Sequence, residues 1–349
     1  SLFGLVAIWS ADGGGAISAG SSVMRQAVYF IVGLGAMAVL SSVHYRFLKS
    51  FAVVMYLGAI GLLLSLLAIG TNIDGSTRWI TFGPLSFQPS EVAKVAVIVT
   101  LAAFISERQY EMDRFSNFLL TMVIVGVPAG IVFIQPDLGT TGVFAAIWLG
   151  MMLMSSTRMI YIVGTMLLSI PGALIAWQFL MQDYQKDRLL VSYDPYRDYF
   201  GSGFNIIQAQ ISIGSAGWFG QGLTGGFQSQ YEFLSVRNSD FIFAHAMSMF
   251  GFIGGIALFA TFLLLIWRLF RAVTIARDTF GQQIAAGVAT MIFFQTFINI
   301  GMNLGLMPVT GIPLPFVSLG GTALFINLAA IGIIESIVMH HRKLGFQSM

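Results

Sequence analysis

The sequence predicts an all-α polytopic membrane protein with about ten transmembrane helices. Hydrophobic residues make up 56% of its 349 residues and charged residues only 9%, whereas a soluble domain carries roughly 25% charged residues. The chain also contains long, continuous apolar runs, and a helix needs ~20 residues to cross a bilayer. Such runs are too long for barrel strands, so helices remain as the structure that satisfies the backbone in lipid.

The apolar runs place the spans in order along the chain. We expect them at about 24–43, 50–70, 91–107, 116–134, 139–155, 157–180, 241–267, 281–303 and 319–339. Residues 1–9 have the composition of the end of one more span, which gives ten. Because the chain opens part-way into this apolar segment, we expect further residues to precede Ser1.

The distribution of cations predicts the orientation. One set of short connections holds Arg46, Lys49, Arg108, Arg114, Arg158, Arg268, Arg271, Arg277, Arg342 and Lys343. The opposite set of short loops holds little beyond Arg25 and Arg78. Since cytoplasmic loops carry the excess of Lys and Arg, both termini are expected in the cytoplasm. The long connections 181–240 and 304–318 then face the outside, where we expect any chemistry on that side to occur.

Composition excludes some kinds of chemistry. The chain has no cysteine, so it forms no disulfide and performs no thiol catalysis. Its four histidines are scattered, which argues against a zinc site. The net charge of +2 says little about partners, and we expect no nucleic acid and no organic cofactor.

Residues 181–240 form the one long polar excursion, a large loop between the seventh and eighth predicted helices. The segment is too short and too rich in glycine to fold as a separate soluble domain, so 1–349 is expected to be one transmembrane domain. Long loops are usually functional or disordered. The many aromatic residues argue against disorder here. We therefore expect short helices lying against the membrane.

A corner before the third long span carries charge close to hydrocarbon. Gln88-Pro89-Ser90-Glu91 precedes Lys94, and Arg78 lies upstream. We expect Ser90 to cap the helix, with Glu91 and Lys94 on one face of its first turn. One interpretation is a capped helix with a local ion pair. The other, which we favour because a lysine inside a span is expensive, is a phosphate-binding corner formed by Arg78, Lys94 and the helix N-terminus.

Two further segments break the helical pattern. The first is a tight outward turn from Gln135 to Thr140, with Asp137 at its centre. For this turn we weigh a simple structural role and a functional role evenly. The stretch from Met307 to Gly321 carries three prolines, which forbid a regular helix. Irregular backbone at membrane depth must be buried in protein or line a cavity. We therefore favour a re-entrant cavity wall for 304–318 over a plain external connection.

Asp240 lies where the long polar loop turns into an apolar helix. A carboxylate so close to hydrocarbon costs several kcal/mol unless it has a partner or a task. One interpretation is a helix N-cap, a role that Ser239 could also fill. The other is a base that accepts a proton from a substrate at the membrane surface.

These motifs together resemble the SEDS family (shape, elongation, division and sporulation). The matching motifs are Arg25-Gln26, Arg78-Trp79-Ile80 with Gln88-Pro89-Ser90-Glu91, Gln135 to Thr140, Gly214-Ser215, Asp240-Phe241-Ile242-Phe243-Ala244, and Pro308 to Ser318 with Gly320-Gly321. They cover nearly the whole chain in the family's order, and the run 301–310 is more similar to the RodA branch than to the division branch. The chain departs from the family at Ser248-Met249, where an acidic pair is common, and at Leu319, where a tyrosine is usual.

The resemblance implies a peptidoglycan glycosyltransferase of GT-C-like fold. It would polymerise lipid II at the outer face of the bacterial cytoplasmic membrane during cell elongation. A class B penicillin-binding protein, a transpeptidase, is the implied partner, besides the membrane lipids. Two rivals remain: a lipid II flippase or transporter, which needs a polar path across the membrane, and a non-catalytic scaffold for the penicillin-binding protein.

Forming a β-1,4 bond from an α-linked pyrophosphate donor inverts the anomeric carbon, and one general base suffices for it. Asp240 is the candidate base. Lys94, Arg78, Arg188 and a divalent cation, Mg²⁺ or Mn²⁺, are the candidates for stabilising the leaving pyrophosphate. Gln88, Glu91 and Asp137 match family cavity positions and would orient the sugar or the metal. The sequence assigns no metal ligands.

Overall fold

The computed structural model describes residues 1–15, 18, 21–69, 71–73, 76–82, 85–199, 202–223 and 238–340. The helices are α1 (Leu2–Ala11), α2 (Ser22–Ser42), α3 (Phe47–Ile69), α4 (Pro89–Glu107), α5 (Phe115–Ile134), α6 (Leu138–Leu153), α7 (Met159–Ile175), α8 (Asp183–Tyr193), α9 (Ser202–Ser215), α11 (Ile242–Ile275), α12 (Thr279–Asn303) and α13 (Gly321–Met339). Shorter elements are the π-helical turn η1 (Ala176–Leu180), the 3₁₀ turn η2 (Pro195–Asp198) and the strands β1 (Thr71–Ile73), β2 (Ser76–Phe82) and β3 (Leu85–Phe87).

Helices occupy all ten predicted spans, which confirms the predicted polytopic membrane protein. Eight are long and apolar enough to cross a membrane, and α1 and α6 are shorter apolar helices. The long connection before α11 contains α8, η2 and α9, as expected for a segment with its own short helices. Helix α11 continues to Ile275, beyond the predicted end at 267, and Arg268 and Arg271 in this extension lie over the ring of Trp267.

The chain divides into two compact units, which are described separately. The first unit comprises Ser1–Phe30, Val163–Leu264 and Phe293–Leu324. The second unit comprises Ile31–Ile162, Leu265–Ile292 and Phe325–Met349. Helices α2, α7, α11, α12 and α13 contribute residues to both units.

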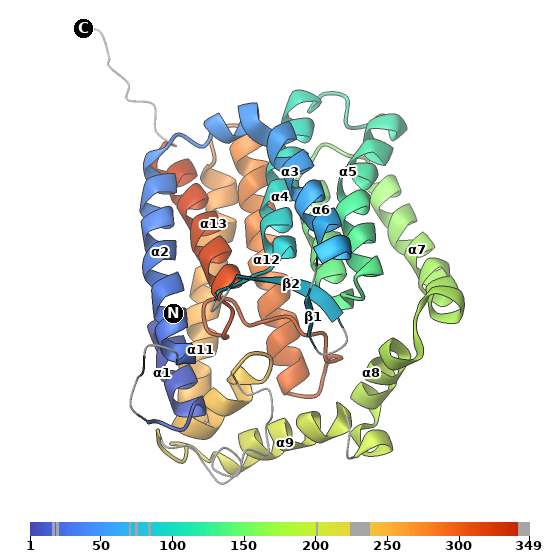
Figure 1. Ribbon diagram of the computed structural model, residues 1–349. Helices are drawn as coiled ribbons and strands as arrows, with labels where there is room; N and C mark the ends of the chain where they lie inside the picture. Colours follow the sequence, from blue (N-terminus) through green and yellow to red (C-terminus); the bar gives the residue numbers. More distant parts are fainter. Residues whose placement is uncertain are drawn as a thin grey trace, which may run out of the picture. The chain divides into compact units, whose positions relative to one another are not determined.

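In the second unit, α3, α4, α5 and α6 pack against one another (Figure 1). Helix α4 is central to this group, and most of its side chains are buried. Small residues permit close approach, as expected for helices packed in a membrane. At Gly150 of α6, for example, an added Cβ would lie 2.1 Å from the hydroxyl oxygen of Thr290.

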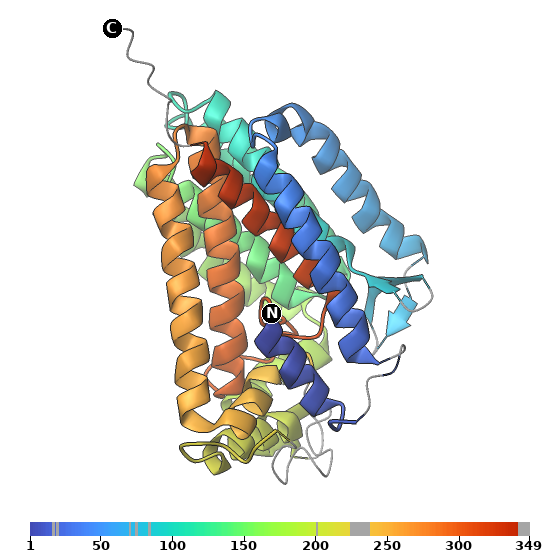
Figure 2. The same cartoon turned by 90° about the vertical axis from the view of Figure 1, so that its left-hand side faces the viewer.

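A three-stranded antiparallel sheet follows α3 in the second unit, in the order β1-β2-β3. Figure 2 shows these strands as pale blue arrows at the end of that helix. Thr71 pairs with Trp79, and Ile80 pairs with Phe87. The sequence prediction did not include this sheet, because its strands are short and lie in a connection that we read only for charge.

In the first unit, α9 packs against the start of α11. Ala209, Phe241 and Ala244 form a buried apolar cluster, with Ile213 and Val309 packed on it. The cluster joins the helix of the long connection, the first residues of α11 and the segment that follows α12. Because Phe241 and Ala244 belong to it, the cluster adjoins the Asp240 junction.

Helix α11 is broken at Gly251, which has φ 68° and ψ −166°. The break is bonded by the segment after α9. The N–H groups of Gln221 and Gly222 donate to the carbonyls of Ser248 and Met249, at 2.8 and 3.2 Å. In return the N–H of Phe252 donates to the carbonyl of Gly217 at 2.9 Å. Backbone groups freed by the break are thus satisfied inside the protein, as a membrane requires.

Candidate functional site

Two buried asparagines fix the backbone of Asp240 in the first unit. Asn299 and Asn303 lie one turn apart on α12, and both are fully buried. Their Nδ2 groups donate to the carbonyl oxygen of Asp240, at 3.1 and 3.0 Å. Asn303 Oδ1 accepts a hydrogen bond from the N–H of Ala244 at 3.0 Å. The junction between loop and helix is therefore held from a neighbouring helix.

The same bonds bear on the N-cap interpretation of Asp240. Helix α11 begins at Ile242, so Phe241 occupies the position before the helix and Asp240 lies one residue earlier. A capping side chain normally accepts from the second or third N–H of the helix. The third, that of Ala244, is bonded by Asn303 instead. Asp240 is not needed as the acceptor for that donor.

The Pro-rich segment is bound to the Asp240 junction. It is irregular from residue 304 to 320, and Ile312, Leu314 and Val317 are buried. The carbonyl of Ile312 accepts from Asn299 Nδ2 at 2.8 Å. The predicted irregular, protein-buried segment is therefore confirmed, while its role as a cavity wall stays a prediction.

Ser318 makes a second connection between these segments. Its hydroxyl donates to the carbonyl of Ser239 at 2.6 Å and accepts from the N–H of Leu314 at 2.8 Å. The N–H of Leu319 donates to the carbonyl of Asn238 at 2.8 Å. The backbone on both sides of Asp240 is thus bonded to the Pro-rich segment or to α12.

Gln26 on α2 anchors the end of the Pro-rich segment. Its Nε2 donates to the carbonyl of Ser318 at 3.0 Å, and its Oε1 accepts from the N–H of Gly320 at 3.2 Å. The side chain is buried. Gln26 of the family motif that opens this span therefore has a structural function here, because it holds the Pro-rich segment that is bonded to the Asp240 junction.

The side chain of Asp240 is half-buried and approaches Gly311. A Cβ added at Gly311 would lie 3.8 Å from Asp240 Oδ2. Gly311 has φ +72°, a conformation that glycine adopts at little cost. The carboxylate therefore lies against a part of the Pro-rich segment that has no side chain.

The corner at the start of α4 forms in the second unit. Lys94 Nζ and Glu91 Oε1 are 2.8 Å apart, and both side chains are at most 2% exposed. Glu91 Oε2 is buried and has no hydrogen-bond partner among the residues that the structure describes. The prediction that the two residues lie on one face of the first turn is confirmed, and they form the ion pair of the interpretation that we did not favour. The phosphate-binding role of the corner stays a prediction.

The predicted cap of this helix was wrong. Helix α4 begins at Pro89, and Gln88 rather than Ser90 occupies the N-cap position. Proline suits the first helical position because its missing N–H would have no partner there and its φ is already helical. Ser90 consequently lies inside the first turn, where it is buried. Gln88 is half-buried, and its carbonyl accepts from the N–H of Glu91.

Asp137 is the N-cap of α6. Its Oδ1 accepts from the N–H of Thr140 at 3.0 Å and its Oδ2 from the hydroxyl of Thr140 at 2.9 Å. Neighbouring Gln135 donates to the carbonyl of Leu63 at 2.7 Å. Both carboxylate oxygens thus have a structural role, which favours the turn-chemistry interpretation. A substrate role for Asp137 remains a prediction.

The remaining candidates lie elsewhere on the chain. Arg188 is exposed on α8, in the same unit as Asp240. The backbone of Arg78 belongs to β2, but its side chain lies outside the described part. Gln88, Glu91, Lys94 and Asp137 belong to the second unit. The structure brings Glu91 and Lys94 into contact, and a single site shared with Asp240 stays a prediction.

The donor set for a divalent cation is sparse. Within the described ranges, no three His, Cys, Asp or Glu side chains converge. Mg²⁺ commonly uses one or two carboxylates together with substrate phosphates. Glu91 Oε2, which has no partner in the described part of the chain, fits such a role as a single protein ligand. A cation held mainly by a pyrophosphate substrate is thus compatible with these residues.

The sequence prediction missed Asn299 and Asn303. Their spacing of four places both amides on one face of α12, and polar side chains inside an apolar span are rare and usually paired. This spacing was a usable signal. What it could not give was the partner, because Asp240 is 59 and 63 positions away along the chain.

Comparison with known proteins gives a family match over almost the whole chain. The family of FtsW, RodA and SpoVE, described as "Cell cycle protein", matches residues 1–343. The peptidoglycan glycosyltransferase MrdB of Escherichia coli K12 is 37% identical over 99% of this chain and 92% of its own length. A probable peptidoglycan glycosyltransferase FtsW of Geobacter sp. M18 is 35% identical over 90% of this chain and 85% of its own.

A solved structure gives the same result for the fold. It is described as a peptidoglycan synthase complex that coordinates polymerization and crosslinking. Its matching chain superimposes with a TM-score of 0.81 at 28% identity. The match covers 98% of this chain and 97% of that one.

Proposed function

Because the chain belongs to the FtsW, RodA and SpoVE family of cell cycle proteins, the SEDS family, we propose that it polymerises lipid II into glycan strands. It is a multi-pass membrane protein and a peptidoglycan glycosyltransferase. Three parts of this function are proposed. They are lipid II as the substrate, the outer face of the cytoplasmic membrane as the place, and cell elongation as the process. The two relatives are nearly equal in identity, so the elongation role rests on the RodA-like run 301–310.

Asp240 acts as the general base in this proposal. Its carboxylate takes the proton from the acceptor sugar hydroxyl as that oxygen attacks the anomeric carbon of the donor. The bond to the lipid pyrophosphate breaks on the opposite face, so the configuration inverts. The observation that carries this role is the fixed junction. Asn299 and Asn303 hold the Asp240 backbone, so the carboxylate is positioned before substrate arrives, as a positioned base requires.

Positive charge is required at the leaving pyrophosphate. We assign this role to Lys94, Arg78 and Arg188, and assign sugar or ion orientation to Gln88, Glu91 and Asp137. Lys94 forms an ion pair with Glu91 at 2.8 Å. Because Glu91 neutralises the lysine, the pair alone is a weak anion site. A divalent cation, Mg²⁺ or Mn²⁺, on the pyrophosphate would supply further electrostatic stabilisation.

The proposed orientation places both termini in the cytoplasm, which follows from the cations in the short connections. The proposed partner is a class B penicillin-binding protein. A relative of similar fold belongs to a complex described as coordinating polymerization and crosslinking, which supports a transpeptidase partner. Comparing glycan synthesis with and without that partner tests this part independently of Asp240.

The deciding experiment uses the purified full chain with lipid II, a divalent ion and the cognate penicillin-binding protein, and measures glycan strands. Asp240→Asn keeps the shape of the side chain and removes the base, so we expect product formation to fall by roughly 10²–10⁴-fold. Asp187→Asn on α8 is the matched control, since it removes an exposed carboxylate from the same unit. Product at the wild-type rate from Asp240→Asn would refute the general base.

The same experiment separates the rival functions. A flippase moves lipid II across vesicles without forming polymer, and a scaffold stimulates its partner without needing Asp240. The assay uses a transpeptidase that forms no polymer alone. If polymer then forms only with this chain and only when Asp240 is present, the flippase and the scaffold are both excluded.

A further inference from the structure

We propose that a basic cavity in the second unit binds a phosphate group, either of an anionic lipid headgroup or of a soluble phosphate compound. The cavity has a volume of about 470 Å³ and lies where the connection α2–α3 meets the connection α11–α12. This volume is within the range of small-molecule sites. None of the residues assigned to glycan synthesis line this cavity.

The charge of the walls favours an anion. Arg46, Lys49 and Arg277 line the cavity, and Asp278 is the one acid among its lining residues. The amide of Gln109 and the hydroxyl of Ser106 add neutral polar groups. Arginine offers a planar fork of donors that matches phosphate oxygens, and lysine offers a compact charge.

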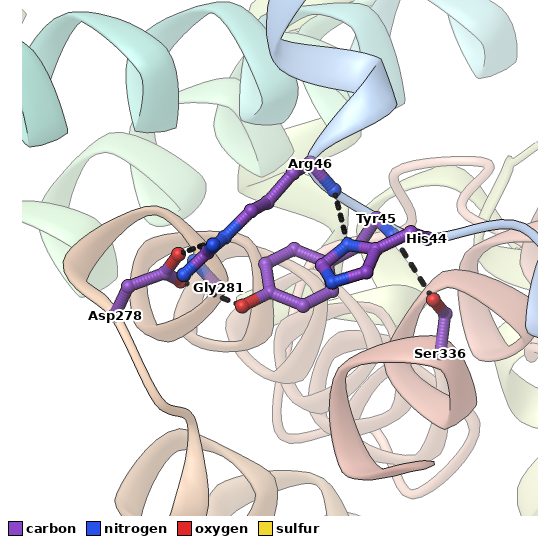
Figure 3. A network of polar contacts seen from close by, with 6 residues as sticks. All are labelled: His44, Tyr45, Arg46, Asp278, Gly281 and Ser336. Carbon is purple, nitrogen blue, oxygen red and sulfur yellow. Dashed lines mark hydrogen bonds and ion pairs between the residues drawn. The ribbon is translucent and has the colours of Figure 1, made fainter. Parts of the chain in front are cut away.

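Asp278 is already occupied by other donors, as Figure 3 shows. Its Oδ2 accepts from Arg46 Nε at 2.8 Å. Its Oδ1 accepts from the hydroxyl of Tyr45 and the N–H of Gly281, both at 2.9 Å. Ser336 fixes this network by accepting from the N–H of Tyr45 at 3.1 Å. The acid therefore serves the network rather than the other two cations of the cavity.

Those two cations remain for a ligand. Arg277 is exposed and forms no ion pair with any residue that the structure describes. Among the described residues, Lys49 pairs with Glu107 in a loose, exposed contact, 3.6 Å from Nζ to Oε1, and such surface pairs are worth little. Without a ligand, like charges gathered around one cavity repel one another. A phosphate would relieve this repulsion.

The surroundings of the cavity suit a lipid source. Arg46 and Arg277 lie in connections that the charge pattern assigns to the cytoplasmic side, and Lys49 lies in the first turn of α3 at the same end. Basic pockets between membrane helices on that side commonly bind anionic headgroups, and each cation near the surface contributes about fivefold in affinity. A soluble phosphate compound would use the same donors from the aqueous side.

The test titrates the purified full chain, in neutral detergent, with phosphatidylglycerol and separately with phosphatidylcholine, and counts bound lipid by native mass spectrometry. We expect phosphatidylglycerol to bind more tightly, and Lys49→Gln and Arg277→Gln each to weaken it by about fivefold. Arg268→Gln is the matched control. It removes one cation that lies over Trp267 and does not line the cavity.

A second arm identifies the source of the phosphate and uses the wild type and Arg277→Gln. Inorganic phosphate is compared with chloride at equal ionic strength, with thermal unfolding of both proteins as the readout. Protection by phosphate that Arg277→Gln removes supports a soluble ligand, while selective lipid binding without such protection supports a headgroup. Equal binding of the two lipids with no protection by phosphate would overturn the proposal. So would a loss in Arg268→Gln as large as that in Arg277→Gln.

Discussion

Asn303 on α12 donates a hydrogen bond to the backbone carbonyl of Asp240 at 3.0 Å. Its Oδ1 also accepts from the N–H of Ala244 at 3.0 Å, so one buried amide bonds the chain on both sides of the loop–helix junction. Side chains that act in catalysis need support of this kind, because small misplacements cost large factors in rate. The position of Asp240 is therefore set by a residue far away in the sequence.

Replacing Asn303 by alanine should impair glycan synthesis through Asp240. The substitution leaves the buried N–H of Ala244 without this partner, at roughly 1–3 kcal/mol, while the carbonyl of Asp240 keeps its bond from Asn299. We expect the rate of polymer formation per folded molecule to fall by at least tenfold and thermal stability to fall as well. Lipid II polymerisation and thermal unfolding should be measured on the same preparation.

A control separates loss of position from loss of stability. Asn117 is also a buried asparagine, and its Nδ2 donates to the carbonyl of Glu111 at 2.8 Å. Asn117→Ala should destabilise the protein to a similar degree while the folded fraction retains its polymerisation rate. If Asn117→Ala and Asn303→Ala lose equal activity per folded molecule, Asn303 has no specific role in positioning Asp240.

Gly311→Ala should disturb the site next to the Asp240 carboxylate. Glycine at φ +72° becomes strained when a Cβ is added, at about 1–2 kcal/mol, and the new methyl group would face Asp240 Oδ2. We expect slower polymerisation. Gly320→Ala serves as the control within the same segment, since its Cβ would meet only the Ala323 side chain, at 3.5 Å. Comparable losses in both variants would argue against a special role for Gly311.

Most of the fold was predictable because the bilayer fixes the length of a spanning helix. Apolar runs located all ten helices, and their predicted ends lie within a few residues of the observed ones except for α11. The three short strands from Thr71 to Phe87 were not predicted. Their pairing depends on backbone hydrogen bonds between neighbouring strands. Strands of seven residues or fewer show little periodicity in their sequence.

The candidate site was predictable in its residues and much less in its contacts. Lys94 and Glu91 were expected on one helix face because of their spacing of three, but the ion pair between them was the interpretation that we did not favour. The bonds from Asn299 to both Asp240 and Ile312 join three segments that are distant in sequence. No local pattern encodes such contacts. Ser90 was misassigned as a cap because serine is the usual signal, whereas Pro89 occupies the first helical position and the helix begins two residues earlier than predicted.

The buried pair of Glu91 and Lys94 allows a test of whether Lys94 binds the substrate. Removing one partner leaves an uncompensated buried charge, which costs roughly 3–5 kcal/mol. Glu91→Gln and Lys94→Met should therefore each destabilise the protein strongly. Because replacing both partners of a buried pair is often close to neutral, the double variant should regain most of the thermal stability.

The double variant then isolates function from folding. If Lys94 stabilises the leaving pyrophosphate, the stable double variant should remain at least tenfold slower in lipid II polymerisation than the wild type. A double variant that is both stable and fully active would show that the pair is structural only. A double variant less stable than either single variant would contradict the description of Glu91 and Lys94 as one buried pair.

The Asp278 network should make stability depend on pH in the acid range. Burial raises the pKa of the Asp278 carboxyl, but hydrogen bonds from Gly281, Tyr45 and Arg46 outweigh it and hold the pKa below its usual value. A lowered folded-state pKa gives stability that is fully present above the unfolded value of about 3.9. It is lost as pH falls through the folded-state pKa.

Asp278→Asn should reveal this contribution directly. Asparagine can still accept from the N–H of Gly281 at the start of α12, but it loses the charge that faces Arg46. We expect a lower thermal unfolding temperature than the wild type above about pH 5, with the difference shrinking steadily below about pH 4. Asp113→Asn, which breaks an exposed 3.3 Å contact with Arg158, should change little at any pH. A difference between Asp278→Asn and wild type that stays constant down to pH 2 would mean that the carboxylate charge adds nothing to the network, because protonating it in the wild type would then have no effect.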